Sequence, residues 1–173
     1  MIKSINMIVV IVVLLLGFGL FYFSQKAAPL RGTISRLVVN KSKRELLAFD
    51  NKDKLLKRYR IALGSNPVGH KQIQGDGKTP EGFYVINDKN PNSIAYKNLG
   101  ISYPNEADSQ HARQLGKSTG GDIKIHGLMN GWGFLGWLNR YSDWTAGCIA
   151  ITNSEMEELY RAVKIGTRIE INP

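Results

Sequence analysis

The sequence contains a single cysteine, and this scarcity limits the chemistry available to the chain. Cys148 has no second cysteine with which to form an intramolecular disulfide, and one thiol cannot build a cysteine zinc site. The other histidines, His70 and His111, lie in polar stretches where surface histidines are usual, so we assign no metal site. A lone cysteine is more often a small buried residue than a catalyst. The residues around it must decide between these interpretations.

Acidic residues are also few. The sequence has 14 Asp and Glu against 23 Lys and Arg, which gives a net charge of +9. A positive domain favours anionic partners such as nucleic acid, anionic lipid or a carboxylate-rich polymer. Dense Lys/Arg runs and basic motifs interleaved with aromatic residues are both missing, so nucleic acid is not an expected partner. Internal repeats and low-complexity tracts are missing too, and the 43% hydrophobic content is that of a globular domain.

Only one long hydrophobic run is present, from Met7 to Phe23, with Lys3 before it and Lys26 after it. Its length is at the short end for a spanning helix. Lys26 falls where a signal-peptide cleavage site would need a small residue. We therefore predict an uncleaved membrane anchor in residues 1–30, followed by an extracytoplasmic domain in residues 31–173. A cleaved signal, followed by secretion, is the alternative.

The remainder of the chain reads mostly as strands, with one clear helix. The helix is expected from Glu155 to about Val163, because Asn153 or Ser154 can cap it. Gly64 to Gly82 is rich in Gly and Pro and predicts a long loop, and residues 88–120 read as irregular. Strands are expected at 33–39, 44–50, 55–63, 83–87, 123–126, 148–152 and 167–171. The domain is therefore predicted to be mostly β.

Two short segments carry the candidate chemistry: Ile125-His126-Gly127 and Thr145-Ala146-Gly147-Cys148-Ile149. A thiol is a useful nucleophile only as the thiolate, so a nearby imidazole must take its proton or lower its pKa. The imidazole needs a partner on its other nitrogen, and the Gly127 carbonyl is the adjacent candidate. Gly147 could aim its own N–H and that of Cys148 at one carbonyl oxygen, forming an oxyanion hole. These residues alone leave a catalytic pair and a structural pair about equally supported.

At these positions the sequence resembles the L,D-transpeptidases of the YkuD type, which pair an upstream His-Gly with a downstream Ser/Thr-x-Gly-Cys. Further similarity covers roughly residues 33–172. The similar segments are Gly75-Asp76-Gly77-Lys78-Thr79-Pro80-Glu81-Gly82 with Phe83-Tyr84-Val85-Ile86, then Ile101-Ser102-Tyr103-Pro104-Asn105, Asp143-Trp144-Thr145, and Gly166-Thr167 with Arg168-Ile169-Glu170-Ile171. Several ordered motifs together are far more specific than one.

The resemblance implies a β-sandwich-like catalytic domain with mixed sheets, held in the cell envelope. It implies that Cys148 attacks a stem peptide of peptidoglycan, with His126 as general base. The thioester is then resolved by an amine in a transpeptidase, or by water in a hydrolase. Some relatives attach lipoprotein to the wall or detach it, so a wall-linked lipoprotein is a second candidate partner. The resemblance implies no metal or organic cofactor.

The sequence departs from the family pattern at two positions. Ala146 stands where many members have His, and Ala150 stands where many have an Arg that meets a substrate carboxylate. Another cation must then serve, and Arg140 and Arg113 are candidates.

Four residues are expected to contact the substrate: Tyr103, Arg140, Trp144 and Thr145. Trp144 could belong to a lid or wall over the cleft, although a local hydrophobic cluster explains the tryptophans equally well.

Three other functions compete with this prediction. A sortase would need an Arg several residues after the cysteine, and residues 149–159 contain none. In NlpC/P60-type peptidases the Cys precedes the His, which is the reverse of the order here. A non-catalytic wall-binding domain would not require both Cys148 and His126.

Overall fold

The computed structural model describes residues 9–14 and 30–173, without the side chains of Trp137 and Arg140. Residues 9–14 are helical, and the rest of the predicted anchor from Met7 to Phe23 lies outside the described residues. None of the helices in the described part of the chain is long and apolar enough to cross a membrane.

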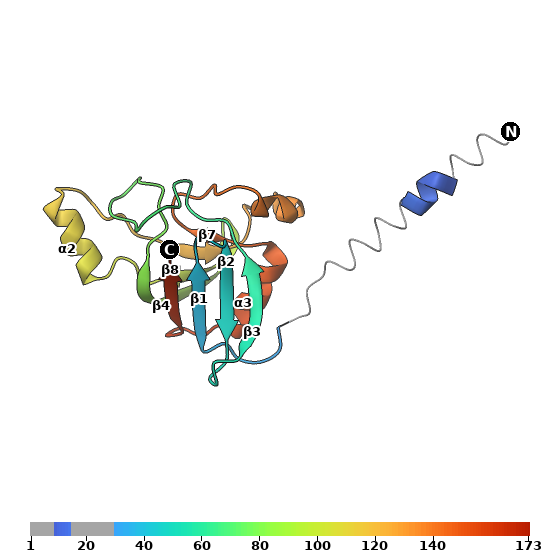
Figure 1. Ribbon diagram of the computed structural model, residues 1–173, viewed down its shortest axis with the longest axis horizontal. Coiled ribbons are helices and arrows are strands. Elements are labelled where there is room, and N and C mark those ends of the chain that lie inside the picture. Colours follow the sequence, from blue (N-terminus) through green and yellow to red (C-terminus); the bar gives the residue numbers. More distant parts are fainter. Residues whose placement is uncertain (1–8, 15–29) are drawn as a thin grey trace.

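Within the described residues, eight strands form one mixed sheet, in the spatial order β3-β2-β1-β8-β4-β5-β6-β7. Figure 1 shows β4, β8, β1, β2 and β3 side by side. β1 pairs in parallel with β8, and β6 in parallel with β7, whereas the other neighbouring strands are antiparallel. The strands are β1 (Arg36–Asn40), β2 (Glu45–Phe49), β3 (Leu55–Arg60), β4 (Gly82–Ser93), β5 (Tyr96–Ile101), β6 (Lys124–His126), β7 (Ile149–Ala150) and β8 (Arg168–Asn172).

The sheet curls because β4 changes partner along its length. Its first residues, Gly82 to Val85, pair with β8, and the part from Ile86 to Ser93 pairs with β5 through two register shifts. Such irregularities bend a strand. At one end the curl closes, because Ala62 bridges to Ala150 and Gly64 to Thr145. The domain is mostly β, as predicted, but its strands form one curled sheet rather than two separate layers.

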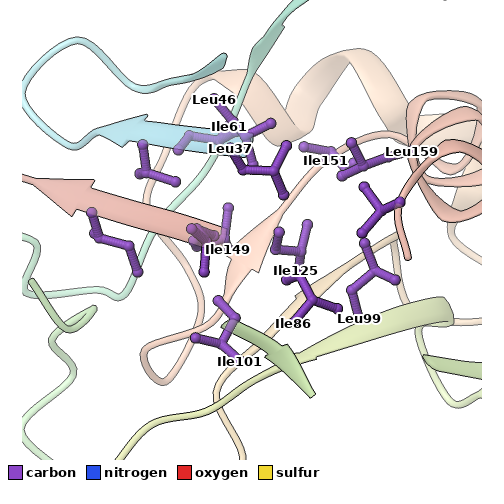
Figure 2. Packing of buried hydrophobic residues seen from close by; sticks show 14 of the residues in the cluster. Leu37, Leu46, Ile61, Ile86, Leu99, Ile101, Ile125, Ile149, Ile151 and Leu159 are labelled. Atoms are coloured by element: carbon purple, nitrogen blue, oxygen red, sulfur yellow. The ribbon is translucent and has the colours of Figure 1, made fainter. Parts of the chain in front are cut away.

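Helix α3 (Asn153–Ala162) lies inside this curl and completes the core. It packs on β5 and β6, and its Glu158 accepts hydrogen bonds from Lys57 and Tyr59 of β3. Met156 and Leu159 of the helix are fully buried. Figure 2 shows the surrounding aliphatic cluster, which includes Leu37, Leu46, Ile61, Ile86, Leu99, Ile101, Ile125, Ile149 and Ile151. Burial of these side chains is the main favourable term in folding.

Residues 88–120 are not irregular throughout, and the prediction for them was wrong. β4 continues to Ser93, β5 follows, and helix α2 (Glu106–Gln114) is capped by Asn105, which forms a capping box with Asp108. The helix gives little periodic signal, because only Asp108 and Ala112 of its residues are buried. Figure 1 shows α2 standing away from the sheet. A 3₁₀ helix, η1 (Gly133–Arg140), also lies between the two catalytic motifs.

Helix α3 was predicted, but its first residue was not. Its N-cap is Thr152, whose side chain accepts a hydrogen bond from the Glu155 N–H, rather than Asn153 or Ser154.

Candidate active site

The predicted base lies on β6, and the predicted nucleophile immediately precedes the parallel neighbour β7. Ile125 and Ile149 are partners in the parallel register, and both side chains are fully buried in the core. Because side chains alternate along a strand, the neighbouring residues face the other way. That face, which we call the site face, carries Lys124 and His126 of β6. Cys148 immediately precedes β7, and its sulfur accepts a hydrogen bond from the Lys124 backbone N–H.

The thiol of Cys148 is half-buried and lies against the backbone of the strand beside it. Its Sγ lies 3.7 Å from the Asp122 carbonyl oxygen, which can accept a hydrogen bond from the thiol. Burial raises the pKa of the Cys148 thiol, while a hydrogen bond from the Lys124 backbone N–H to the sulfur acts in the opposite direction. The resting thiol is therefore protonated at neutral pH, and an attack on a substrate requires a base.

The imidazole of His126 is arranged as a neutral base. Its Nδ1 lies 2.6 Å from the Gly127 carbonyl oxygen, and because a carbonyl can only accept, Nδ1 must carry the proton. The unprotonated nitrogen is then Nε2. Burial lowers the pKa of His126, although the bond to Gly127 opposes this effect. The Trp144 ring meets the imidazole edge to face, with 5.7 Å between ring centroids. This packing fixes the ring plane.

The turn before the nucleophile is held by Thr145. Its buried Oγ1 donates to the Cys148 carbonyl at 2.7 Å and accepts from the Gly147 N–H at 3.1 Å. Thr145 therefore shapes the turn. Its hydroxyl is not free to bind a substrate, contrary to the prediction. The Gly147 N–H is likewise occupied, so its expected role in an oxyanion hole does not fit this arrangement. Among the described residues, the Cys148 N–H has no acceptor.

Gly147 is required by both its conformation and its surroundings. Its φ of +135° lies where side chains are rarely accommodated, and a Cβ here would lie 2.6 Å from the Lys78 carbonyl oxygen. Close packing also holds at Gly64, where a Cβ would lie 2.1 Å from the Gly77 carbonyl oxygen. The glycine-rich loop of residues 64–82 therefore lies directly against the nucleophile turn.

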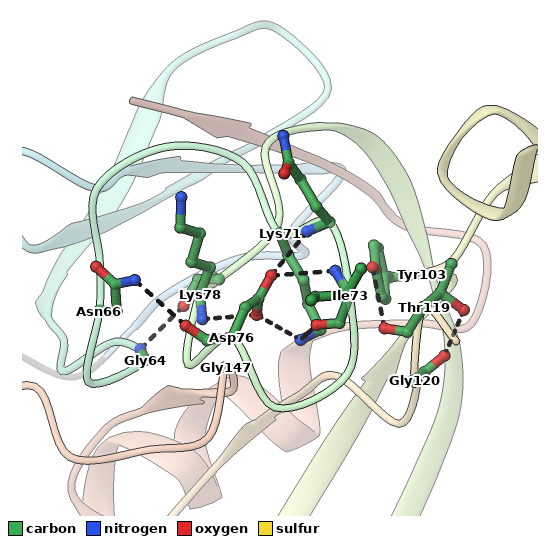
Figure 3. Close-up of polar contacts among 12 residues, drawn as sticks. Gly64, Asn66, Lys71, Ile73, Asp76, Lys78, Tyr103, Thr119, Gly120 and Gly147 are labelled. Atoms are coloured by element: carbon green, nitrogen blue, oxygen red, sulfur yellow. Dashed lines mark hydrogen bonds and ion pairs between the residues drawn. The ribbon is translucent and has the colours of Figure 1, made fainter. Parts of the chain in front are cut away.

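Asp76 organises that loop, as Figure 3 shows. Its carboxylate accepts from Lys71 Nζ at 2.9 Å and from the backbone N–H groups of Gln72, Ile73 and Lys78 at 2.8 to 3.2 Å. Burial acts to raise the pKa of Asp76, but these hydrogen bonds outweigh it and lower the pKa to about 2. Lys71 is only 3% exposed and also donates to the Ile73 carbonyl. The loop is a structural turn, as the sequence indicates.

Among the remaining predicted substrate contacts, Trp144 alone has a described side chain at the surface. It is 39% exposed and lines an open apolar pocket of about 280 Å³ together with Leu128, Trp132 and Leu135. Its Nε1 donates to the Asn139 side chain at 2.6 Å.

Of the other two predicted contacts, the structure does not support Tyr103, and Arg140 stays a prediction. Tyr103 is 5% exposed, and its hydroxyl donates to the Thr119 carbonyl at 3.4 Å, so it is a core residue rather than part of a cleft. The side chain of Arg140 lies outside the described residues. Arg113, the other candidate cation, lies on α2 and pairs with Glu106.

Several contacts that build the site were not predicted. His70 accepts from the Glu81 N–H and bonds Asp108 at 3.0 Å, which ties the glycine-rich loop to α2. Arg44 pairs with Asp143, which also accepts from the Leu63 N–H. These pairs are distant in sequence and leave no local signal. The described residues include no cluster of His, Cys, Asp and Glu that could hold a metal ion.

Known proteins share the sequence and fold of this chain. YafK of Escherichia coli (strain K12) is 34% identical over 111 residues, which cover 63% of this chain and 37% of YafK. The cell shape determining protein Pgp2 of Campylobacter jejuni superposes with a TM-score of 0.59 at 25% identity, covering 90% of this chain and 54% of Pgp2. An L,D-transpeptidase of Mycobacterium smegmatis shares the fold, with a TM-score of 0.52 at 13% identity over 79% of this chain and 58% of that one.

The chain spans only about a third to a half of the length of YafK and Pgp2, so these relatives contain further residues outside the shared domain. The family model that describes the L,D-transpeptidase catalytic domain, YkuD, matches residues 34–171. That match includes the curled sheet except its last residue, Asn172, together with α3 and both candidate motifs. The chain therefore belongs to the YkuD family of L,D-transpeptidase catalytic domains.

Proposed function

We propose that this chain is a peptidoglycan L,D-transpeptidase in which Cys148 is the nucleophile and His126 the general base. The observation that carries the proposal is the bond between His126 Nδ1 and the Gly127 carbonyl at 2.6 Å. It leaves Nε2 unprotonated, and the parallel register pairs His126 with Ala150, two residues after Cys148. A neutral imidazole beside a protonated thiol is the starting state for nucleophilic catalysis by cysteine.

In the first half-reaction, Nε2 takes the thiol proton while the sulfur attacks the carbonyl carbon after the L-centre of a stem peptide. The negative charge develops on the carbonyl oxygen, and the Cys148 N–H is the donor that we assign to it. The C–N bond then breaks, and the imidazolium of His126 gives its proton to the departing amine of the terminal D-residue. A thioester on Cys148 remains.

In the second half-reaction, the amine of a neighbouring stem attacks the thioester and loses its proton to His126. The C–S bond breaks, the thiol regains its proton, and a new amide links the two stems. If water attacks instead, the same steps release a free carboxylate, and the chain acts as a hydrolase that trims stems or releases a wall-linked lipoprotein. The residues of the site serve both outcomes equally.

The substrate places the domain outside the cytoplasm, because peptidoglycan is a polymer of the cell envelope. The run from Met7 to Phe23 would anchor it to the membrane, and this remains a prediction. The description of Pgp2 as a determinant of helical cell shape suggests that the present chain also acts on wall architecture.

The test is the product spectrum of the purified chain with tetrapeptide stems and with lipoprotein-linked wall fragments, read by mass spectrometry. Dimers or exchange of the terminal D-residue indicate transfer. Trimmed or detached products alone would replace the transpeptidase assignment with the hydrolase.

A second measurement separates both enzymes from a non-catalytic wall-binding domain. Incubation with a carbapenem should add the mass of one β-lactam to the reduced protein and none to Cys148→Ala. No mass gain in the folded wild type, together with equal binding of wall fragments by Cys148→Ala, would leave only the binding domain.

A further inference from the structure

The site lacks the cation that the sequence pattern of the family supplies after the nucleophile. Ala150 occupies that position and is fully buried. A stem peptide nevertheless presents carboxylates close to its scissile amide, and a buried or half-buried carboxylate needs a partner. The question is which cation of this chain lies within reach of the reacting carbonyl.

Most nearby cations are already committed or point elsewhere. The Arg44 guanidinium is bound to Asp143 through Nε and Nη2. Lys71 is 3% exposed and bound to Asp76, so it cannot reach a substrate. The ammonium group of Lys78 points away from Gly147 in Figure 3.

Lys124 differs from these cations in position and in exposure. It shares the site face with His126, two residues along β6, and its backbone N–H donates a hydrogen bond to the Cys148 sulfur. Its side chain is 27% exposed, so it is partly accessible from solvent.

The partner of Lys124 can be displaced. Its Nζ lies 2.6 Å from Asp122 Oδ1, but the Asp122 side chain is 79% exposed. An ion pair with such an exposed carboxylate contributes little stability and exchanges easily. Asp122 itself has a φ of +59°, and its carbonyl oxygen is the one beside the Cys148 sulfur. The segment that holds the thiol therefore also holds Lys124 beside it.

The charge of Lys124 is felt by both reacting groups. It lowers the pKa of the Cys148 thiol and that of the His126 imidazole, although in each case burial is the larger influence. The ammonium group is thus close enough to influence an anion bound at the sulfur.

We propose that Lys124 is the substrate-carboxylate residue of this site, and that its ammonium group binds the free carboxylate of the departing D-residue. This inference rests on the proposed function, because that residue is the leaving group of the first half-reaction. Its carboxylate lies only two bonds beyond the scissile nitrogen, so it is the nearest free carboxylate to a carbonyl held at Cys148. Lys124 exchanges Asp122 for the substrate carboxylate when a stem binds.

The test measures binding rather than turnover, in a Cys148→Ala background that cannot form a thioester. Calorimetric titrations compare a tetrapeptide stem that ends in a free acid with the same stem ending in a carboxamide. We expect the acid to bind about tenfold more tightly, the size of a charge-assisted hydrogen bond at a partly exposed position. Adding Lys124→Met should abolish this preference, and adding Lys124→Arg should keep most of it.

Two further variants sharpen the result. Lys52→Met removes the same charge from the exposed turn between β2 and β3 and should leave the preference intact. Asp122→Asn frees the ammonium group and should increase the preference for the acid. If Lys124 acted only through the thiol or the fold, Lys124→Met would weaken binding of the acid stem and of the carboxamide stem equally.

The outcomes separate the two proposals. A preference for the acid that survives Lys124→Met overturns the assignment, as does binding of both stems with equal affinity in the parent. Absence of any stem binding would reject the proposed function itself, and the role of Lys124 with it.

Discussion

The guanidinium of Arg44 binds the carboxylate of Asp143 through two nitrogens, at 3.0 Å from Nε and 2.8 Å from Nη2, although the two residues are 99 positions apart. The second oxygen of Asp143 accepts from the Leu63 N–H at 2.9 Å. Asp143 therefore fastens the nucleophile turn to the end of the β3 hairpin. Its role is structural.

Replacing Asp143 with Ala should destabilise the protein by about 2 to 3 kcal/mol, because a mostly covered cation and a buried N–H lose their acceptor. Urea unfolding followed by circular dichroism measures the change. Asp53→Ala is the matched control, since Asp53 pairs with Arg36 but is 77% exposed. Its effect should stay within about 0.5 kcal/mol, and a similar loss in both variants would count against the anchoring role of Asp143.

The acylation rate should be nearly constant around neutral pH and should fall only in acid. Burial lowers the pKa of His126 and raises that of Cys148, so imidazole and thiol are both neutral over a wide range. As pH falls below the ordinary histidine value of about 6.5 and through the lowered pKa, His126 gains a proton and can no longer act as base. Rates of carbapenem acylation, followed by intact mass, measure the profile.

In His126→Ala the pH profile of the acylation rate should change its shape as well as its height. The rate should then rise with pH towards the raised pKa of the thiol, because only the spontaneously formed thiolate reacts. A variant that kept the wild-type plateau would show that His126 is not the base.

Gly147→Ala should abolish acylation and lower stability by about 3 kcal/mol, because the new Cβ would collide with the Lys78 carbonyl and the φ is unfavourable. Gly116 has a positive φ of +63° but open space around its Cα. Gly116→Ala should cost about 1 kcal/mol and leave acylation intact. Thermal unfolding and intact mass report the two effects separately.

Asp76→Asn should destabilise the protein at neutral pH by about 2 kcal/mol, because the ion pair with Lys71 is lost inside the loop. The folded-state pKa of Asp76, about 2, lies below its ordinary value of 3.8. Its contribution is therefore complete above about pH 4 and is lost as pH falls towards the folded pKa. Urea titrations at several pH values should show the gap between wild type and variant shrinking below pH 4. A gap that stayed constant would contradict this account.

The sequence predicted the elements that bury an apolar face. Ile125 and Ile149 lie in short β-strands next to glycine, and both form part of the core as their pattern indicates. Met156 and Leu159 similarly show the buried side of α3. The polar helix α2 was missed because its stability comes from caps and ion pairs, which produce no hydrophobic period.

The site was predictable only in part, because its details depend on partners that are remote in the chain. The motifs located Cys148 and His126, but whether a hydroxyl or N–H is free depends on the folded turn. Thr145 illustrates this: its Oγ1 is used twice within three residues. Lys124 was passed over because a lysine in a strand carries no signal until the fold brings its backbone N–H to the Cys148 sulfur.

The bridges from Ala62 to Ala150 and from Gly64 to Thr145 make the conformation of the turn before Cys148 depend on residues from the N-terminal part of the domain. A fragment that began after Gly64 would keep both Cys148 and His126. It would lack the two bridges that hold the turn before Cys148 in shape. Shortened versions of the domain should therefore retain the residues that follow β3, from Ala62 to Gly64.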